Sequence, residues 1–120
     1  MTPPSQWSVV LKHYGRRSGK AYTLKVWFVE LGDHIWVGTQ DRTRNWARNL
    51  RANHRAELDF GAGPRAYTSR DAGDEAELAR FRAAILAKHP VTARIIVWLS
   101  RGKIPCCFEL TPANGADHTP

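Results

Sequence analysis

Residues 21–40, with the sequence AYTLKVWFVELGDHIWVGTQ, decide the fold class of this chain. The first eleven, residues 21–31, are rich in β-branched and aromatic side chains, which are typical of strands. Gly32 and Asp33 then have the composition of a tight hairpin turn. The residues that follow, 34–40, return to a strand pattern, so this stretch predicts an antiparallel β-hairpin.

Four further segments on either side of this hairpin carry a strand pattern. Two glycine-containing turns, residues 15–20 and 61–63, join neighbouring strands at the short spacing that is typical of antiparallel hairpins. The predicted strands are residues 7–14, 55–60, 64–70 and 104–110. Together with the hairpin they make six strands, of which the first three form a meander.

Two segments show helical periodicity instead. Residues 41–54 carry one apolar stripe that includes Trp46, with arginines around the rest of the helix. Residues 74–89 predict the longest helix. Asp74 can cap the N-terminus of this helix, with Glu77 three residues later in the position of a capping box.

The predicted order is therefore β-β-β-α-β-β-α followed by a last strand. Residues 91–99 precede that strand and fit a helix or a strand, and the sequence leaves this open. Antiparallel hairpins with helices between them predict a mainly β fold, a small six-stranded antiparallel barrel with two or three peripheral helices. We expect residues 1–112 to form a single domain and residues 113–120 to be a mobile C-terminal tail.

The chain is strongly basic. It has 18 Lys and Arg against 11 Asp and Glu, which gives a formal net charge of +7. Such a charge favours an anionic partner: nucleic acid, membrane headgroups, or a phosphorylated or polycarboxylate ligand. No apolar run approaches the ~20 residues that a membrane-spanning helix needs, so we expect no membrane span.

Metal and nucleophile chemistry have little support in the sequence. The five histidines are scattered, without a second ligand at metal-binding spacing, so no metal site is predicted. Cys106 and Cys107 are adjacent, and neighbouring residues of a strand point to opposite faces, so a disulfide between them is not expected. Reduced thiols predict a cytoplasmic protein.

The turn GRRSGK, residues 15–20, concentrates groups that bind anions. Two arginines, a serine and a lysine stand in a turn that contains two glycines, and their side-chain and backbone donors can converge on a phosphate or a carboxylate. A solvated basic hairpin explains the same composition. The spacing of the glycines differs from that of a Walker loop, and no helix follows the turn.

Aromatic and basic residues elsewhere also allow two interpretations. Trp27 and Phe28 are neighbours on one strand, so one faces the core and the other faces outward or into a cleft. Trp46 suits the core, and it also suits stacking on a flat ligand. The arginines in and next to the first helix fit an anion channel or a solvated face. These arginines are Arg42, Arg44, Arg48, Arg51 and Arg55.

Four pieces of the sequence, in this order and spacing, resemble one known family. The sequence is similar to the deazaflavin-dependent nitroreductases, a branch of the split β-barrel flavin-binding folds related to pyridoxamine 5′-phosphate oxidase. The resemblance covers about residues 8–112. The matching pieces are YGRRSGK (14–20), NWARNLRANHR (45–55), SRDAGDEAEL (69–78) and KIPCCFEL (103–110).

The resemblance implies a split β-barrel and a deazaflavin-dependent oxidoreductase. The family's cofactor is an 8-hydroxy-5-deazaflavin (coenzyme F-420), which carries a phosphate and an oligoglutamate tail and transfers hydride to a quinone, enone or nitro compound. The family's phosphate contacts correspond to Arg16, Arg17, Ser18 and Lys20. Its ring contacts correspond to Gly38, Thr39, Gln40, Trp46 and Asn49. No catalytic residue is assigned.

Three alternatives stay open at this point. FMN is the second candidate cofactor of the same fold. A cofactor-binding or ligand-binding barrel without turnover is suggested by residues 92–100, TARIIVWLS, where nitroreductase-type members of the family carry tyrosines. A basic nucleic-acid-binding barrel is a less favoured alternative. Split barrels often form homodimers, so a homodimer that acts on a small-molecule substrate is a further expectation.

Overall fold

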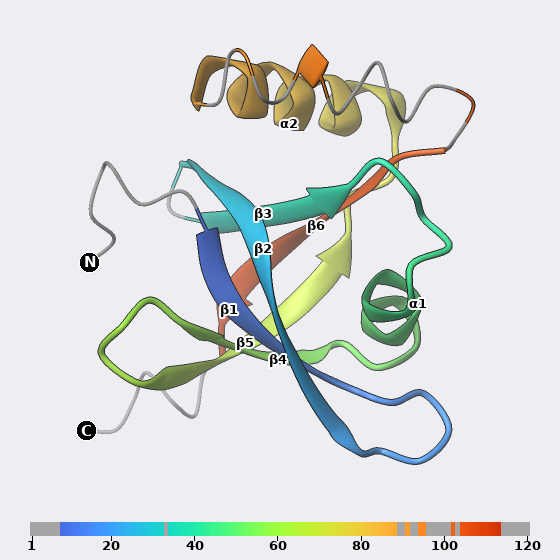
Figure 1. Ribbon diagram of the computed structural model, residues 1–120, viewed down its shortest axis with the longest axis vertical. Coiled ribbons are helices and arrows are strands. Elements are labelled where there is room, and N and C mark those ends of the chain that lie inside the picture. Colours follow the sequence, from blue (N-terminus) through green and yellow to red (C-terminus); the bar gives the residue numbers. More distant parts are fainter. Residues whose placement is uncertain are drawn as a thin grey trace.

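The structure, a computed structural model, describes residues 8–32, 34–88, 91, 94–95, 102 and 104–113. Six strands form a closed antiparallel barrel in the order β1-β2-β3-β6-β5-β4, as Figure 1 shows. The strands are β1 (Ser8–Tyr14), β2 (Ala21–Leu31), β3 (His34–Thr39), β4 (Arg55–Asp59), β5 (Pro64–Asp71) and β6 (Cys106–Pro112). The helices whose full extent lies in the described residues are α1 (Asn45–Ala52) and α2 (Glu75–Lys88). The predicted six-stranded barrel with peripheral helices is confirmed.

Two element boundaries differ from the prediction for identifiable reasons. Helix α1 begins at Asn45, not at Asp41, because the Asp41 carboxylate accepts hydrogen bonds from the backbone N and the hydroxyl of Thr43 (3.0 and 2.5 Å) and so stabilises a turn instead. Strand β6 extends to Pro112, two residues beyond the predicted end, because its last residues pair with β5.

Several sequence predictions fall wholly or partly outside the described residues. Of the ambiguous segment 91–99, the described residues Val91, Arg94 and Ile95 are helical. Asp33 of the hairpin turn lies outside the described residues, and so does all of the predicted tail except residue 113.

Strands β2 and β3 are paired over only part of their length. Strand β2 pairs with β1 from Ala21 to Trp27, but its pairing with β3 runs only from Phe28 to Leu31. On β3 the last residue paired with β2 is Val37, so Gly38 is paired with β6 and not with β2. The two strands therefore diverge at this point, which is the split of the barrel.

Two apolar clusters hold the fold together. One fills the barrel and includes Phe28, Phe108 and, from α1, Leu50, all fully buried. The other lies between the outer face of the barrel and α2, which covers that face in Figure 1, and includes Phe81 and Ile85. Because each cluster joins a helix to the barrel, both helices are fixed relative to the split.

Gly38 permits the close approach of α2 to β3. A Cβ atom at this position would lie 2.6 Å from the Phe81 ring and 2.7 Å from the backbone oxygen of Cys106. A side chain here would force α2 away from the strand, so the glycine fixes the spacing between the helix and the split.

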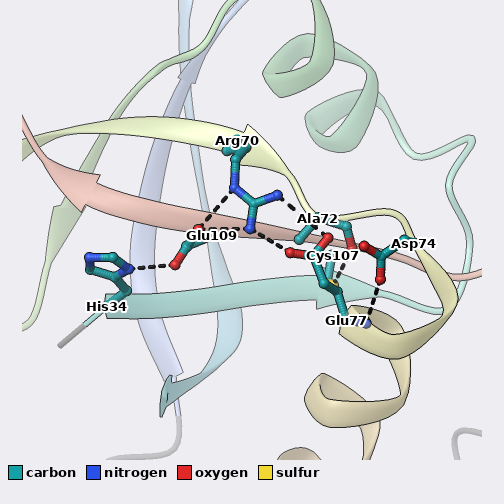
Figure 2. A network of polar contacts seen from close by, with 7 residues as sticks. All are labelled: His34, Arg70, Ala72, Asp74, Glu77, Cys107 and Glu109. Atoms are coloured by element: carbon teal, nitrogen blue, oxygen red, sulfur yellow. Dashed lines mark hydrogen bonds and ion pairs between the residues drawn. The ribbon is translucent and has the colours of Figure 1, made fainter. Parts of the chain in front are cut away.

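A network of charged side chains on the outer surface ties α2 to the sheet (Figure 2). Arg70 of β5 hydrogen-bonds to Glu109 of β6 through Nε (2.9 Å) and to Glu77 of α2 through Nη2 (2.6 Å). His34 bonds to the other oxygen of Glu109. Asp74 accepts a hydrogen bond from the backbone N of Glu77 (2.8 Å), which confirms the predicted cap. The capping-box role predicted for Glu77 is wrong, because its carboxylate pairs with Arg70.

The Glu109 carboxyl makes this network sensitive to acid. Partial burial raises its pKa, but hydrogen bonds from His34 and Arg70 outweigh that effect and hold the pKa below its ordinary value. The ionised carboxylate therefore stabilises the fold fully at pH values above the ordinary pKa of a glutamate. Its contribution is lost as the pH falls through the lowered pKa.

We expect Glu109→Gln to lose less unfolding free energy than the wild type as the pH falls from about 5 to about 3. The variant has no carboxylate to protonate at this position, whereas the wild type must take up a proton there on unfolding. Urea unfolding across that pH range measures the difference. Parallel pH dependences of the two proteins would contradict the assignment.

Cys106 and Cys107 face the two different apolar clusters, as their alternation on a strand predicts. Both are free and buried. Burial raises the pKa of Cys107 to about 12, and its thiol donates a hydrogen bond to the backbone oxygen of Ala72 (3.1 Å, Figure 2). These thiols are therefore protonated and poorly reactive.

Candidate functional site

A groove follows the split of the barrel and has two adjoining halves. The apolar half has a volume of about 310 Å³ and the basic half a volume of about 750 Å³. Leu24, Arg44 and Trp46 line both halves. The two cavities therefore adjoin, with a flat aromatic residue and an arginine at the junction.

The apolar half lies where β2 and β3 diverge. Strand β2 supplies Trp27 on one side and α2 supplies Phe81 and Ile85 on the other. The end of β3 and the residue after it, Gly38, Thr39 and Gln40, complete this wall. A slot lined by aromatic and aliphatic side chains with a few polar groups suits a flat ring.

Trp46 belongs to the core and to the groove at the same time. It is 7% exposed and packs in the barrel cluster, with its ring centroid 6.0 Å from that of Phe108. The small exposed part of Trp46 lines both halves of the groove. The two interpretations of Trp46 that the sequence left open are therefore compatible.

The basic half is formed by the β1–β2 turn and by α1. The turn is closed by backbone hydrogen bonds from Gly15 N to Lys20 O (2.8 Å) and from Gly19 N to Gly15 O (2.9 Å). Gly19 has φ of 72°, in the left-handed region that favours glycine. Four arginines line this half: Arg16, Arg17, Arg44 and Arg48. Such a concentration of cations suits an anionic group.

Asn49 of α1 holds the turn through two partly buried hydrogen bonds. Its Oδ1 accepts hydrogen bonds from the backbone N of Arg16 (3.2 Å) and from Arg16 Nη1 (2.8 Å). Its Nδ2 lies 3.0 Å from Nδ1 of His13. His13 is itself buried, and its ring stacks on Tyr22 at a centroid distance of 5.6 Å. Burial lowers the pKa of His13, which keeps the imidazole neutral.

Eight of the nine predicted cofactor-binding residues line the groove, and Lys20 does not. Lys20 shapes the turn through its backbone, since its N donates to Ser18 Oγ (3.1 Å). Asn49, which the resemblance assigned to the ring, lies in the basic half with Arg16, Arg17 and Ser18. Gly38, Thr39 and Gln40 lie in the apolar half.

Sequence reasoning missed several lining residues, among them His13, Leu24, Phe81 and Ile85. Phe81 and Ile85 were recognisable only as the apolar face of a helix, because nothing local shows that this face borders the split. His13 carried no motif, and its role depends on Asn49, which lies 36 residues later.

The described part of the chain contains no group of three His, Cys, Asp or Glu placed to hold a metal ion. Within that same part, no helix is long and apolar enough to cross a membrane.

Solved structures of other proteins share this fold. The heme storage protein HutZ from Vibrio cholerae is 18% identical, with a TM-score of 0.70 over 90% of this chain and 82% of that one. An F420-H2 dependent reductase is 18% identical, with a TM-score of 0.67 over 88% and 95% of the two chains. A chain described as a domain-swapped dimer is 17% identical, with a TM-score of 0.71 over 92% and 82%. At these identities the likeness shows the fold alone.

Sequence comparison identifies the family. No curated protein matches the chain significantly. The model of one protein family, described as F420H(2)-dependent quinone reductase, matches residues 2–110. This match spans β1 to β5, α1, α2 and β6 as far as Leu110. The chain belongs to the F420H(2)-dependent quinone reductase family.

Proposed function

We propose that the chain is a reductase that binds reduced coenzyme F-420 in the groove and transfers hydride to a quinone-type acceptor. In this proposal the ring occupies the apolar half and the phosphate and acidic tail occupy the basic half. The observation that carries the proposal is that the two halves adjoin and share Arg44 and Trp46 in their linings. A ligand with a flat ring and an anionic tail needs this combination.

The charge of the basic half favours the deazaflavin coenzyme over FMN. Four arginines line it, and no carboxylate is among its described lining residues. The single phosphate group of FMN carries a charge of about −2 at neutral pH. Some of the four arginines would therefore have no anionic partner. A tail with additional carboxylates would use them.

The residues of the groove supply binding and orientation. When bound, the reduced coenzyme supplies the hydride. Trp27, Trp46 and Phe81 can hold a ring in place and exclude water from one side of it. Among the described residues that line the apolar half there is no histidine, tyrosine or carboxylate. The chain therefore contributes position and positive charge, and no acid–base pair is built into the described lining.

Two titrations and one turnover assay test the proposal. The purified chain is titrated with reduced coenzyme F-420 and, separately, with FMN, and coenzyme oxidation is then followed with and without a soluble quinone. We expect binding of the deazaflavin, weaker binding of FMN, and oxidation that depends on the quinone. Tighter binding of FMN would favour the flavin alternative, and binding without turnover would favour a non-catalytic barrel.

The β1–β2 turn offers a matched pair of substitutions. Arg17 lines the groove and Lys20 does not, although both are exposed and carry the same charge. Arg17→Ala is expected to raise the coenzyme dissociation constant about ten- to a hundred-fold, as for the loss of one charge-assisted hydrogen bond. Lys20→Ala should leave it nearly unchanged. Equal effects of the two substitutions would show that general positive charge, and not the groove, attracts the coenzyme.

We also propose a homodimer as the assembly state. The support is the similarity in fold to the chain described as a domain-swapped dimer. Sedimentation analysis of the purified chain, over a range of protein concentrations, distinguishes a dimer from a monomer. A single monomeric species at all concentrations would reject this part of the proposal.

A further inference from the structure

We propose that His13 is a positioning residue, which holds Arg16 in place for an anion through the side chain of Asn49. This inference rests on the proposed function, in which this half of the groove receives the phosphate of the coenzyme. His13 is on β1, Asn49 is on α1, and Arg16 is in the turn between β1 and β2. The three residues come together only in the folded chain.

The hydrogen bonds fix the orientation of the Asn49 amide. Both groups of Arg16 that contact Asn49, the backbone N and Nη1, are donors, so the amide atom that faces them must be Oδ1. The Nδ2 atom of Asn49 therefore faces His13. Since Nδ2 can only donate, Nδ1 of His13 must accept, and the proton of the neutral imidazole must be on Nε2.

The surroundings of His13 favour this neutral form. The ring is 5% exposed and stacks on Tyr22 of β2. On β4 its cross-strand partner is Ala56, and the neighbouring Glu57 accepts a hydrogen bond from Tyr14 (2.7 Å) and pairs with Lys12. The charged side chains that line the same half of the groove are the four arginines. Burial lowers the pKa of His13.

The consequence concerns the entropy of binding. Arg16 is an exposed residue with a long side chain, which would otherwise sample many rotamers. The bonds to Asn49 hold both its backbone N and its guanidinium, and only one of its guanidinium nitrogens is used. The remaining donors are preorganised, so an anion binds with a smaller loss of conformational entropy.

Two substitutions separate the acceptor atom of His13 from the bulk of its ring. His13→Phe keeps a ring that can stack on Tyr22 but has no acceptor, which leaves the Asn49 Nδ2 without a partner. His13→Asn removes the ring but can place an oxygen close to the position of Nδ1. If the acceptor positions Arg16, the asparagine variant retains anion binding and the phenylalanine variant loses it.

The experiment follows the backbone amide signal of Arg16 by NMR at pH 7.5, during titration with inorganic phosphate and, in parallel, with coenzyme F-420. We expect His13→Phe to weaken binding of both ligands about tenfold, and His13→Asn to remain within about threefold of the wild type. Melting curves show whether each variant is folded. Unchanged affinity in His13→Phe, or equal loss in both variants, would overturn the inference.

A direct measurement on the wild type covers the case in which His13→Phe does not fold. The nitrogen chemical shifts of the His13 ring report which nitrogen carries the proton, and a proton on Nδ1 would overturn the inference. If the wild type binds phosphate at Arg16 but not the coenzyme, the proposed function fails, and the two variants still decide the role of His13 with phosphate alone. No response of Arg16 to either ligand would overturn both.

Discussion

Replacing Trp46 by alanine is expected to lower the free energy of unfolding by about 3–5 kcal/mol, as for other large aromatic residues removed from a core. Trp46 is 7% exposed, lies within the barrel cluster and contacts the ring of Phe108. It also anchors α1 to the barrel with Ala47 and Leu50. The substitution therefore leaves a cavity between the helix and the barrel that the neighbouring side chains can fill only in part.

Thermal and urea unfolding measure this effect, and the melting temperature is expected to fall by roughly 10–20 °C for a chain of this size. Trp27→Ala is the matched control, because Trp27 lines the apolar half of the groove but is only partly buried. It should weaken coenzyme binding with a smaller loss of stability. A melting temperature of Trp46→Ala within error of the wild type would show that Trp46 is a ligand contact and not a core residue.

The sequence predicts the strands well because their signal is local. Residues 21–31 were predicted as a strand, and β2 has those bounds. Alternation also predicted that one of Trp27 and Phe28 faces the core, which the structure shows to be Phe28, and it separated Cys106 from Cys107. These properties depend on the two-residue period of a strand and on short turns, so no long-range information is needed.

The sequence does not predict features that depend on contacts between distant residues. Glu77 stands at capping-box spacing from Asp74, yet its carboxylate bonds to Arg70 of β5, and Arg70 also bonds to Glu109 of β6, 39 residues later in the chain. The position of α2 over the split depends on the close contact of Phe81 with Gly38. Local periodicity reveals neither the bonds of Glu77 nor the position of α2. The apolar half of the groove depends on the position of α2.

The basic half of the groove was predictable in part from the sequence. The turn GRRSGK is visible as a motif, and its arginines do line the groove. The sequence could not separate Arg17 from Lys20, because both stand in one short turn and differ only in the direction that the folded turn gives them. The bonds among His13, Asn49 and Arg16 were also not predictable, since they join residues 33 to 36 positions apart.

The substitution with the largest expected effect on binding is Arg44→Glu. Arg44 lines both halves of the groove, so its guanidinium is close to the place where a ring would join an anionic tail. Within the described part of the chain, this guanidinium makes no hydrogen bond or ion pair, and it is exposed. It is therefore available to a ligand at little cost to the fold.

A glutamate at position 44 removes one charge-assisted hydrogen bond and adds a repulsive charge, so we expect the coenzyme dissociation constant to rise more than about a hundred-fold. Stability should not fall, because residue 44 is the N-cap of α1 and a negative charge at a helix N-terminus is favourable.

Arg82→Glu serves as the control. Arg82 is an exposed residue of α2 outside the groove lining, and its substitution makes the same change in net charge. Fluorescence titration of both variants measures the effect. If Arg82→Glu weakens binding as much as Arg44→Glu does, the coenzyme is attracted by the net charge of the chain and the junction of the groove is not its binding site.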